Sequence, residues 1–141
     1  MVAPRRHLPT GLDFDRALSE RIRAGSEAKT VTAAGALVHA LEFLGVKRIG
    51  FASPYVSAIN NLAIDFLAEV GVEAVARSEV GEALVLSCTD MRSVESLTRL
   101  EQAVGKPVIS SNQAMMFQAM QLAGIGEPMT GFGQLLERVR L

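Results

Sequence analysis

The chain has 141 residues, of which 49% are apolar and 21% are charged, and its formal net charge is −1. This length and composition predict one globular domain with a sizeable core and exclude a disordered chain. No basic patch with interleaved aromatic residues occurs, which argues against nucleic-acid binding. No apolar stretch approaches the ~18 residues of a membrane span, and residues 1–10 lack the apolar core of a signal peptide, so we expect a soluble cytoplasmic protein.

Short apolar runs, typical of buried strands, alternate along the chain with segments of helical periodicity. The expected helices cover residues 13–24, 33–44, 57–70, 91–104 and 113–123, with a short sixth at 133–139. The expected strands cover residues 29–31, 46–52, 72–76, 82–87 and 107–110. This alternation predicts βαβ units, and hence an α/β fold in which helices cover both faces of a parallel sheet as a three-layer sandwich.

Typical capping residues stand at the ends of several of these helices. Asp13, Thr32 and Asn112 are expected to cap helix beginnings, and Gly45 to end a helix. Residues 1–12 hold two prolines and a glycine and are expected to be irregular. The predicted organisation is therefore an irregular segment over 1–12 followed by one α/β domain over 13–141.

One connection is too short for this scheme. Only residues 78–81 separate the strand that ends near Arg77 from the strand that begins at Glu82. Parallel strands need a crossover of roughly a dozen residues or more. Either these two strands are antiparallel, or a crossover helix is missing near positions 80/81. A similar gap is expected near 10/11, where a tail joins a helix directly.

Cys88 is the only cysteine of the chain. It follows the apolar run 82–87 and precedes a helical pattern, so it is expected at the carboxyl end of a strand, where open α/β sheets bind ligands. The beginning of a helix there would favour a thiolate. The alternative is a small buried apolar residue. One cysteine and two distant histidines build no recognisable metal site.

A second polar turn, formed by Ser53, Pro54 and Tyr55, ends the strand over 46–52 and should lie at the same edge of the sheet. We expect both turns to face one pocket. Ser110 and Ser111 end the next strand and are candidates for the same pocket, with helix capping as the alternative. Tyr55, the only tyrosine, is otherwise a half-buried packing residue.

Several of these motifs together resemble a known family. Residues 84–92, 100–101, 105–108 and 110–114 resemble the second half of the aspartate/glutamate racemase superfamily. They are most similar to the branch of maleate cis–trans isomerases, arylmalonate decarboxylases and ectoine-utilisation A proteins. Residues 30–34, 45–48 and 53–55, together with Asn60, match the same branch, and the match runs in order from residue 14 to 125.

The resemblance implies the second lobe of a two-lobed α/β fold with an active site between the lobes and no metal or organic cofactor. The first-lobe strand and the crossover helix before the Cys88 strand have no counterpart here. By resemblance Cys88 is the catalytic residue, and Tyr55 hydrogen-bonds a substrate carboxylate, helped by the backbone N–H groups of Thr89 and Asp90. The implied substrate-binding set is Ser53, Pro54, Tyr55, Asn60, Thr89, Asp90, Ser110 and Ser111. Asp90 is given no catalytic role, because its charge would oppose thiolate formation.

The resulting hypothesis is a cofactor-independent enzyme that racemises, isomerises or decarboxylates a small carboxylic or dicarboxylic acid, with Cys88 as nucleophile or general acid/base. One alternative is a non-catalytic carboxylate-binding or regulatory domain of the same superfamily. Another is an interaction protein whose last long helix presents an apolar patch, although apolar residues at helical spacing more often belong to a core. The patch comprises Met115, Met116, Phe117 and Met120. The expected partners are a small carboxylate and a second copy of the chain, with neither nucleic acid nor a membrane.

Overall fold

The computed structural model describes residues 11–26, 28–75 and 81–140. Its helices are α1 (Gly11–Ser26), α2 (Ala33–Leu44), α3 (Ser57–Glu69), α4 (Leu97–Val104), α5 (Ser111–Leu122) and α6 (Gln134–Glu137), and a 3-10 turn, η2 (Val94–Ser96), precedes α4. Its strands are β1 (Arg48–Ala52), β2 (Glu73–Ala74), β3 (Ala83–Leu86) and β4 (Val108–Ser110). The strand expected at 29–31 does not form, because this segment links α1 to α2 and pairs with no strand.

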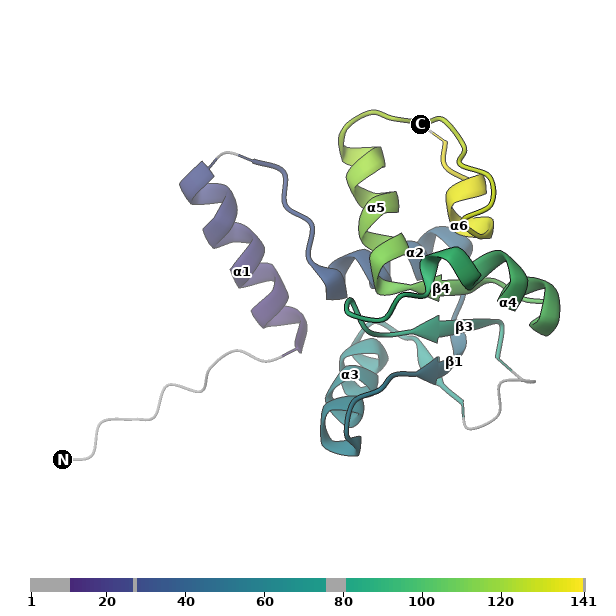
Figure 1. The fold of residues 1–141 in the computed structure, drawn as a ribbon. Coiled ribbons are helices and arrows are strands. Elements are labelled where there is room, and N and C mark those ends of the chain that lie inside the picture. The colour runs from purple at the N-terminus through teal and green to yellow at the C-terminus, as the bar shows by residue number, and fades with distance from the viewer. Residues whose placement is uncertain (1–10, 27, 76–80, 141) are drawn as a thin grey trace.

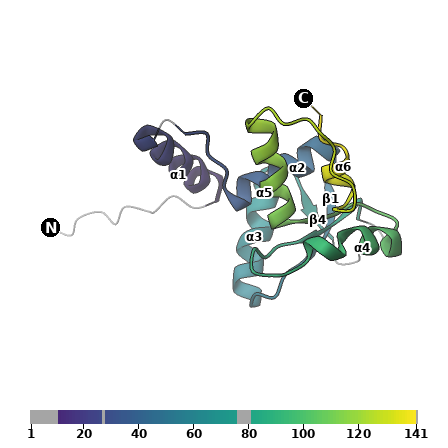
Figure 2. The same cartoon turned by 45° about the horizontal axis from the view of Figure 1, so that its top comes forward.

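All four strands are parallel and lie in the order β2-β1-β3-β4. Figure 1 labels β1, β3 and β4, which lie side by side. Helices α2, α3 and α5 cover one face of the sheet, and α4 packs on the other face (Figures 1 and 2). This arrangement confirms the predicted three-layer α/β fold. The only long helix outside the layers is α1, which lies to one side and has no buried residue.

The core lies between the sheet and helices α2 and α5. Successive strand residues point to opposite faces, so Ile49, Val85 and Ile109 all face these helices and are fully buried. On α5, Phe117 is fully buried and Met120 is 6% exposed. The apolar residues of this helix therefore belong mainly to the core, as their helical spacing favoured.

The short connection between β2 and β3 is explained by their register on β1. Ala74 and Ala83 both lie beside Ile49, one on each side of β1. Because β2 ends at the level where β3 begins, the chain has to cross only the two strand spacings, about 10 Å in total. The strands are parallel, so the antiparallel alternative is excluded. The gap expected near 80/81 adjoins residues 76–80, and the gap expected near 10/11 adjoins residues 1–10; both stretches lie outside the described residues.

Gly81, at the far end of this connection, passes very close to β1. A Cβ atom placed there would lie 2.9 Å from the backbone nitrogen of Gly50. Any side chain would push the connection away from the strand. Glycine therefore permits the close crossing that the register of β2 and β3 requires.

The predicted helix caps are partly confirmed. The Thr32 hydroxyl accepts a hydrogen bond from the N–H of Gly35 at 3.0 Å and begins α2, and Gly45 ends it in a left-handed conformation with φ of 67°. The Asp13 cap is wrong, because α1 already begins at Gly11. Its first turn instead donates the Leu12 N–H to the carboxylate of Glu69 on α3.

A buried carboxylate joins α4, β4 and α6. Glu101, on α4, is 7% exposed and accepts the N–H of Val108 at 3.0 Å and the N–H of Gln134 at 2.9 Å. Burial raises the pKa of the Glu101 carboxyl, while the two backbone N–H donors oppose the shift. The contacts indicate a structural brace between three elements.

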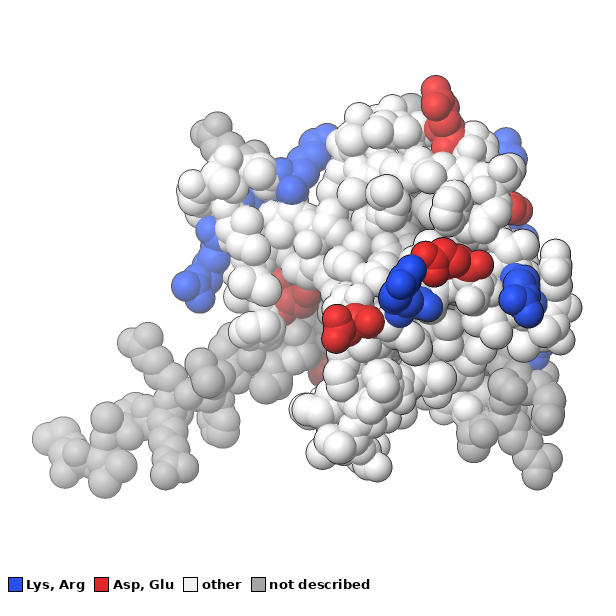
Figure 3. All heavy atoms as spheres, viewed as in Figure 1, with Lys and Arg blue, Asp and Glu red and all other residues white. Residues whose placement is uncertain are grey.

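The described residues include no helix that is both long and apolar enough to span a bilayer. On the face shown in Figure 3, basic and acidic side chains are interspersed and do not form a patch of one sign. This distribution agrees with the near-neutral charge of the sequence.

Candidate active site

The candidate site lies at the carboxyl ends of the two central strands. From β1 the chain crosses to β2 on one side, and from β3 it crosses to β4 on the other. The ends of β1 and β3 therefore form the point where the strand order reverses, which is where open α/β sheets bind ligands. A hollow of about 420 Å³ opens there. It is lined by Pro54, Tyr55, Cys88, Asp90 and Met91.

Cys88 and Tyr55 meet in this hollow, as expected from two polar turns that face one pocket. The Tyr55 hydroxyl lies 3.4 Å from the Cys88 sulfur. Cys88 is 6% exposed, whereas Tyr55 is 46% exposed, so the tyrosine forms the outer wall and the sulfur the floor. Sulfur and hydroxyl are thus close enough to share a proton.

The surroundings of Cys88 favour its thiolate. The Tyr55 hydrogen bond is the main cause that lowers the pKa of the Cys88 thiol, and the backbone N–H groups of Asp90 and Met91 lower it further. Burial of the sulfur and the charge of Asp90 oppose this shift. The same contact with Cys88 raises the pKa of Tyr55, which favours the protonated hydroxyl as the donor of this hydrogen bond when the sulfur is a thiolate.

The beginning of a helix, which was expected to stabilise the Cys88 thiolate, does not lie beside Cys88. After Cys88 the chain turns through residues 89–93 and the 3-10 turn η2, and α4 begins only at Leu97. The field of a helix end falls off within about one turn, so α4 does not act on Cys88. The N–H donors of the turn itself, from Asp90 and Met91, take its place.

The Tyr55 turn is held by two residues of the predicted substrate-binding set. The Tyr55 N–H donates to the Ser53 hydroxyl at 3.1 Å, and the Asn60 side-chain amide donates to the Tyr55 carbonyl at 3.1 Å. The Ser53 hydroxyl in turn donates to the Asn60 side-chain oxygen. Neither residue lines the hollow; both position the turn that carries Tyr55.

The structure places Ser110 and Ser111 away from this hollow. Ser110 is fully buried, and its hydroxyl accepts the Gln113 N–H at 3.2 Å and caps α5. Ser111 lines a separate apolar cavity of about 230 Å³ together with Ser87. The capping alternative is therefore confirmed for Ser110.

Asn112 does not cap α5, because the helix begins one residue before it, at Ser111. Its side-chain amide instead donates to the Thr89 carbonyl in the turn that follows Cys88, at 2.9 Å. Sequence reasoning missed this contact and the participation of Met91. A backbone N–H leaves no trace in residue type, so no signal pointed to Met91.

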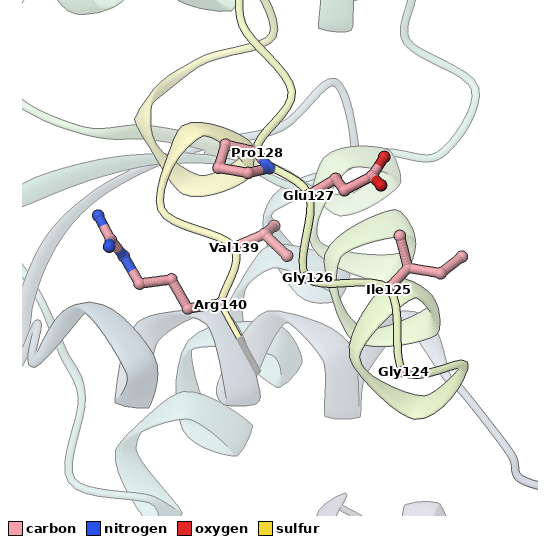
Figure 4. A pocket seen from close by; sticks show the side chains of 7 residues that line it. All are labelled: Gly124, Ile125, Gly126, Glu127, Pro128, Val139 and Arg140. Atoms are coloured by element: carbon pink, nitrogen blue, oxygen red, sulfur yellow. The ribbon is translucent and has the colours of Figure 1, made fainter.

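A larger hollow of about 780 Å³ lies near the C-terminal end of the described chain (Figure 4). Its charged residues, Glu127 and Arg140, extend to opposite sides in this view, and no cysteine, serine or histidine lines it. The described residues also contain no cluster of three or more histidine, cysteine, aspartate or glutamate residues that could hold a metal ion.

Comparison with known proteins supports the resemblance. The family model for arylmalonate decarboxylase matches residues 8–81 and 67–136, which together span most of the chain. The arylmalonate decarboxylase of Bordetella bronchiseptica is 27% identical over 157 residues, covering 90% of this chain and 65% of that protein. A maleate isomerase of Pseudomonas putida is 26% identical over 159 residues, covering 89% and 64%.

The chain thus spans about two thirds of the length of these relatives. The aligned regions are longer than the chain itself, so each relative has internal residues without a counterpart here. The two matches of the family model overlap over residues 67–81, which contain β2 and most of the short connection to β3.

Solved structures agree with this assignment. A crystal structure of arylmalonate decarboxylase superposes with a TM-score of 0.85 at 26% identity, covering 91% of this chain and 68% of that one. The maleate isomerase Iso from Pseudomonas putida S16 gives a TM-score of 0.83 at 24% identity, covering 90% and 64%, and supports the fold. The chain therefore belongs to the arylmalonate decarboxylase family, within the branch of the aspartate/glutamate racemase superfamily that includes the maleate isomerases.

Proposed function

We propose that the chain carries the catalytic cysteine of a cofactor-independent enzyme that acts on a small carboxylic or dicarboxylic acid. The observation that supports this most strongly is the Cys88 sulfur 3.4 Å from the Tyr55 hydroxyl at the point where the strand order reverses. Both curated relatives described above are enzymes named for small carboxylates, malonates in one case and maleate in the other.

The lowered pKa of Cys88 bears on which reaction the site performs. Addition to an alkene and removal of a proton both begin from the thiolate, whereas protonation of an enediolate begins from the thiol. A lowered pKa raises the fraction of thiolate at a given pH, and the thiolate is the better nucleophile or base. Isomerisation or racemisation is therefore favoured over decarboxylation.

In the isomerase form of the proposal, the Cys88 sulfur forms a C–S bond with one alkene carbon. The π electron pair moves to the adjoining carbon and its carboxylate. Rotation about the resulting single bond is followed by cleavage of the C–S bond, and its electron pair leaves with the sulfur as the double bond reforms. Among the described residues that line the hollow, Tyr55 alone carries a hydroxyl, and it would donate to the substrate carboxylate or to the departing thiolate.

Turnover by the purified chain tests the proposal directly. Maleate, phenylmalonate and L-aspartate would be incubated separately with the wild-type chain in D2O and followed by proton NMR. We expect conversion or solvent-deuterium exchange with at least one of the acids, and none with Cys88→Ala. A folded wild-type chain that leaves all three unchanged contradicts catalysis by this chain.

The second candidate function is a carboxylate-binding domain without catalysis. It is favoured by the internal residues of the enzymatic relatives that have no counterpart in this chain. Calorimetric titration with malonate separates the two functions. A binding domain holds malonate equally well with cysteine or alanine at position 88 and converts none of the three acids.

A further inference from the structure

Asn112 connects the first turn of α5 to the turn that follows Cys88. Its side-chain amide donates to the Thr89 carbonyl at 2.9 Å, across the ends of β3 and β4. Because Ser110 caps the helix, the Asn112 side chain is not needed for that purpose. Asn112 itself is not in the implied substrate-binding set.

The carbonyl that Asn112 holds belongs to the same peptide unit as the Asp90 N–H. A trans peptide is planar, and its C=O and N–H point in opposite directions. The Asp90 N–H is one of the two backbone donors that lower the pKa of the Cys88 thiol. Fixing the Thr89 carbonyl toward α5 therefore fixes the direction of the N–H donor on the opposite side of the peptide.

We propose that Asn112 is a positioning residue for Cys88, which holds the Thr89–Asp90 peptide so that its N–H stays aimed at the Cys88 sulfur. The inference rests on the proposed function in that the thiolate is the reacting form. Asn112 itself touches neither the sulfur nor the hollow. The titratable groups that act on the sulfur are Tyr55, from the end of β1, and Asp90, in the same turn as Cys88.

The pH dependence of Cys88 alkylation tests this role on the full chain, with iodoacetamide as the probe. Asn112→Leu keeps a side chain of similar size without a donor, and Asn112→Ala removes the side chain. Asn61→Ala, on the exposed side of α3, is the matched control. We expect the apparent thiol pKa to rise by about 0.5–1 unit in both Asn112 variants and to stay unchanged in the control.

A merely structural Asn112 would change the unfolding midpoint and leave the thiol pKa where it is. An unchanged thiol pKa in both variants would overturn the proposal. The rate of alkylation at full ionisation is expected to stay within about twofold of the wild type, because the intrinsic nucleophilicity of a thiolate changes only weakly with its pKa.

A measurement on the wild-type chain keeps the proposal testable if the variants do not fold. The Asp90 amide proton should shift as Cys88 ionises, in a pH titration followed by ¹⁵N-resolved NMR, and should not shift in this way in Cys88→Ala. An Asp90 amide that does not respond to the ionisation overturns the proposal. Both tests are independent of turnover. A chain that converts no acid yet shows these shifts refutes the proposed function and leaves the role of Asn112 intact.

Discussion

Cys88 and Glu101 are both nearly covered acids that accept backbone N–H groups, yet their pKa values shift in opposite directions. They are 6% and 7% exposed. The largest influence on Cys88 is the Tyr55 hydroxyl, which favours its charged form, whereas the largest influence on Glu101 is burial, which disfavours it. Burial and backbone donors are therefore not enough to mark a reactive group; a side-chain proton donor beside an open hollow distinguishes Cys88.

The Cys88→Ala variant should distinguish the surroundings of Cys88 from those of Glu101 by the largest effect. Because Cys88 is the only cysteine, this variant should lose all labelling by iodoacetamide and, under the proposed function, all turnover. The small change in volume should leave the fold intact. Proton NMR measures the loss of turnover, and a circular-dichroism melting curve checks that the fold is intact. Conversion of substrate by the alanine variant would assign the chemistry elsewhere.

Glu101→Ala should have the opposite effect. It leaves the N–H groups of Val108 and Gln134 without their acceptor, and should lower the free energy of unfolding by about 2–4 kcal/mol. Urea denaturation measures this loss. The Cys88 alkylation rate should stay at the wild-type value; a change in that rate would show that the two regions are coupled.

Glu101→Gln tests the raised pKa of Glu101 through the pH dependence of stability. A carboxyl whose folded-state pKa is raised contributes stability below its unfolded pKa and loses that contribution as pH rises through the folded pKa. The wild-type chain should therefore lose stability relative to Glu101→Gln as the pH rises from the unfolded-state pKa of about 4.3 through the raised folded-state pKa. Urea midpoints at several pH values give this difference, and a constant difference would contradict the assigned cause.

Tyr55→Phe tests the feature that distinguishes Cys88. Without the hydroxyl donor the thiol pKa should rise by about one unit, which lowers the thiolate fraction at neutral pH by up to about tenfold and slows alkylation several-fold. Ser53→Ala removes the acceptor of the Tyr55 N–H but keeps the Tyr55 hydroxyl, so it should change the thiol pKa less. Equal rates for the wild type and Tyr55→Phe would remove Tyr55 from the site.

Asp90→Asn should produce the smallest effect and in the other direction. The substitution keeps the backbone N–H and removes a charge that opposes the thiolate, so the thiol pKa should fall by a few tenths of a unit. Because both groups are close to solvent, the difference should shrink in about 1 M salt. A rise in the thiol pKa would mean that the Asp90 side chain holds the turn.

The sequence was sufficient to predict the parallel sheet and the meeting of Cys88 with Tyr55, because both follow from strand ends that share one edge. It was not sufficient for contacts that depend on where a helix begins. Ser110 and Asn112 are both favourable capping residues, and only the observed start of α5 at Ser111 shows which of them caps. In the same way, α4 begins too late to act on Cys88, and N–H groups of the turn act there instead of the expected beginning of a helix.

The register of β2 and β3 on β1 also could not be predicted from the sequence. Residue patterns indicate that strands exist, but the level at which each meets its neighbour is set by packing in three dimensions. Here that level makes a short parallel crossing possible, where the sequence left antiparallel strands or a missing crossover helix as the alternatives.

The measurement that tests the central claim most directly is the pH profile of Cys88 alkylation by iodoacetamide, with and without malonate. We expect an apparent thiol pKa below the value of about 8.5 for free cysteine, and saturable protection by malonate. A thiol pKa at or above that value, with no protection at any malonate concentration, would contradict a reactive thiolate in a carboxylate site.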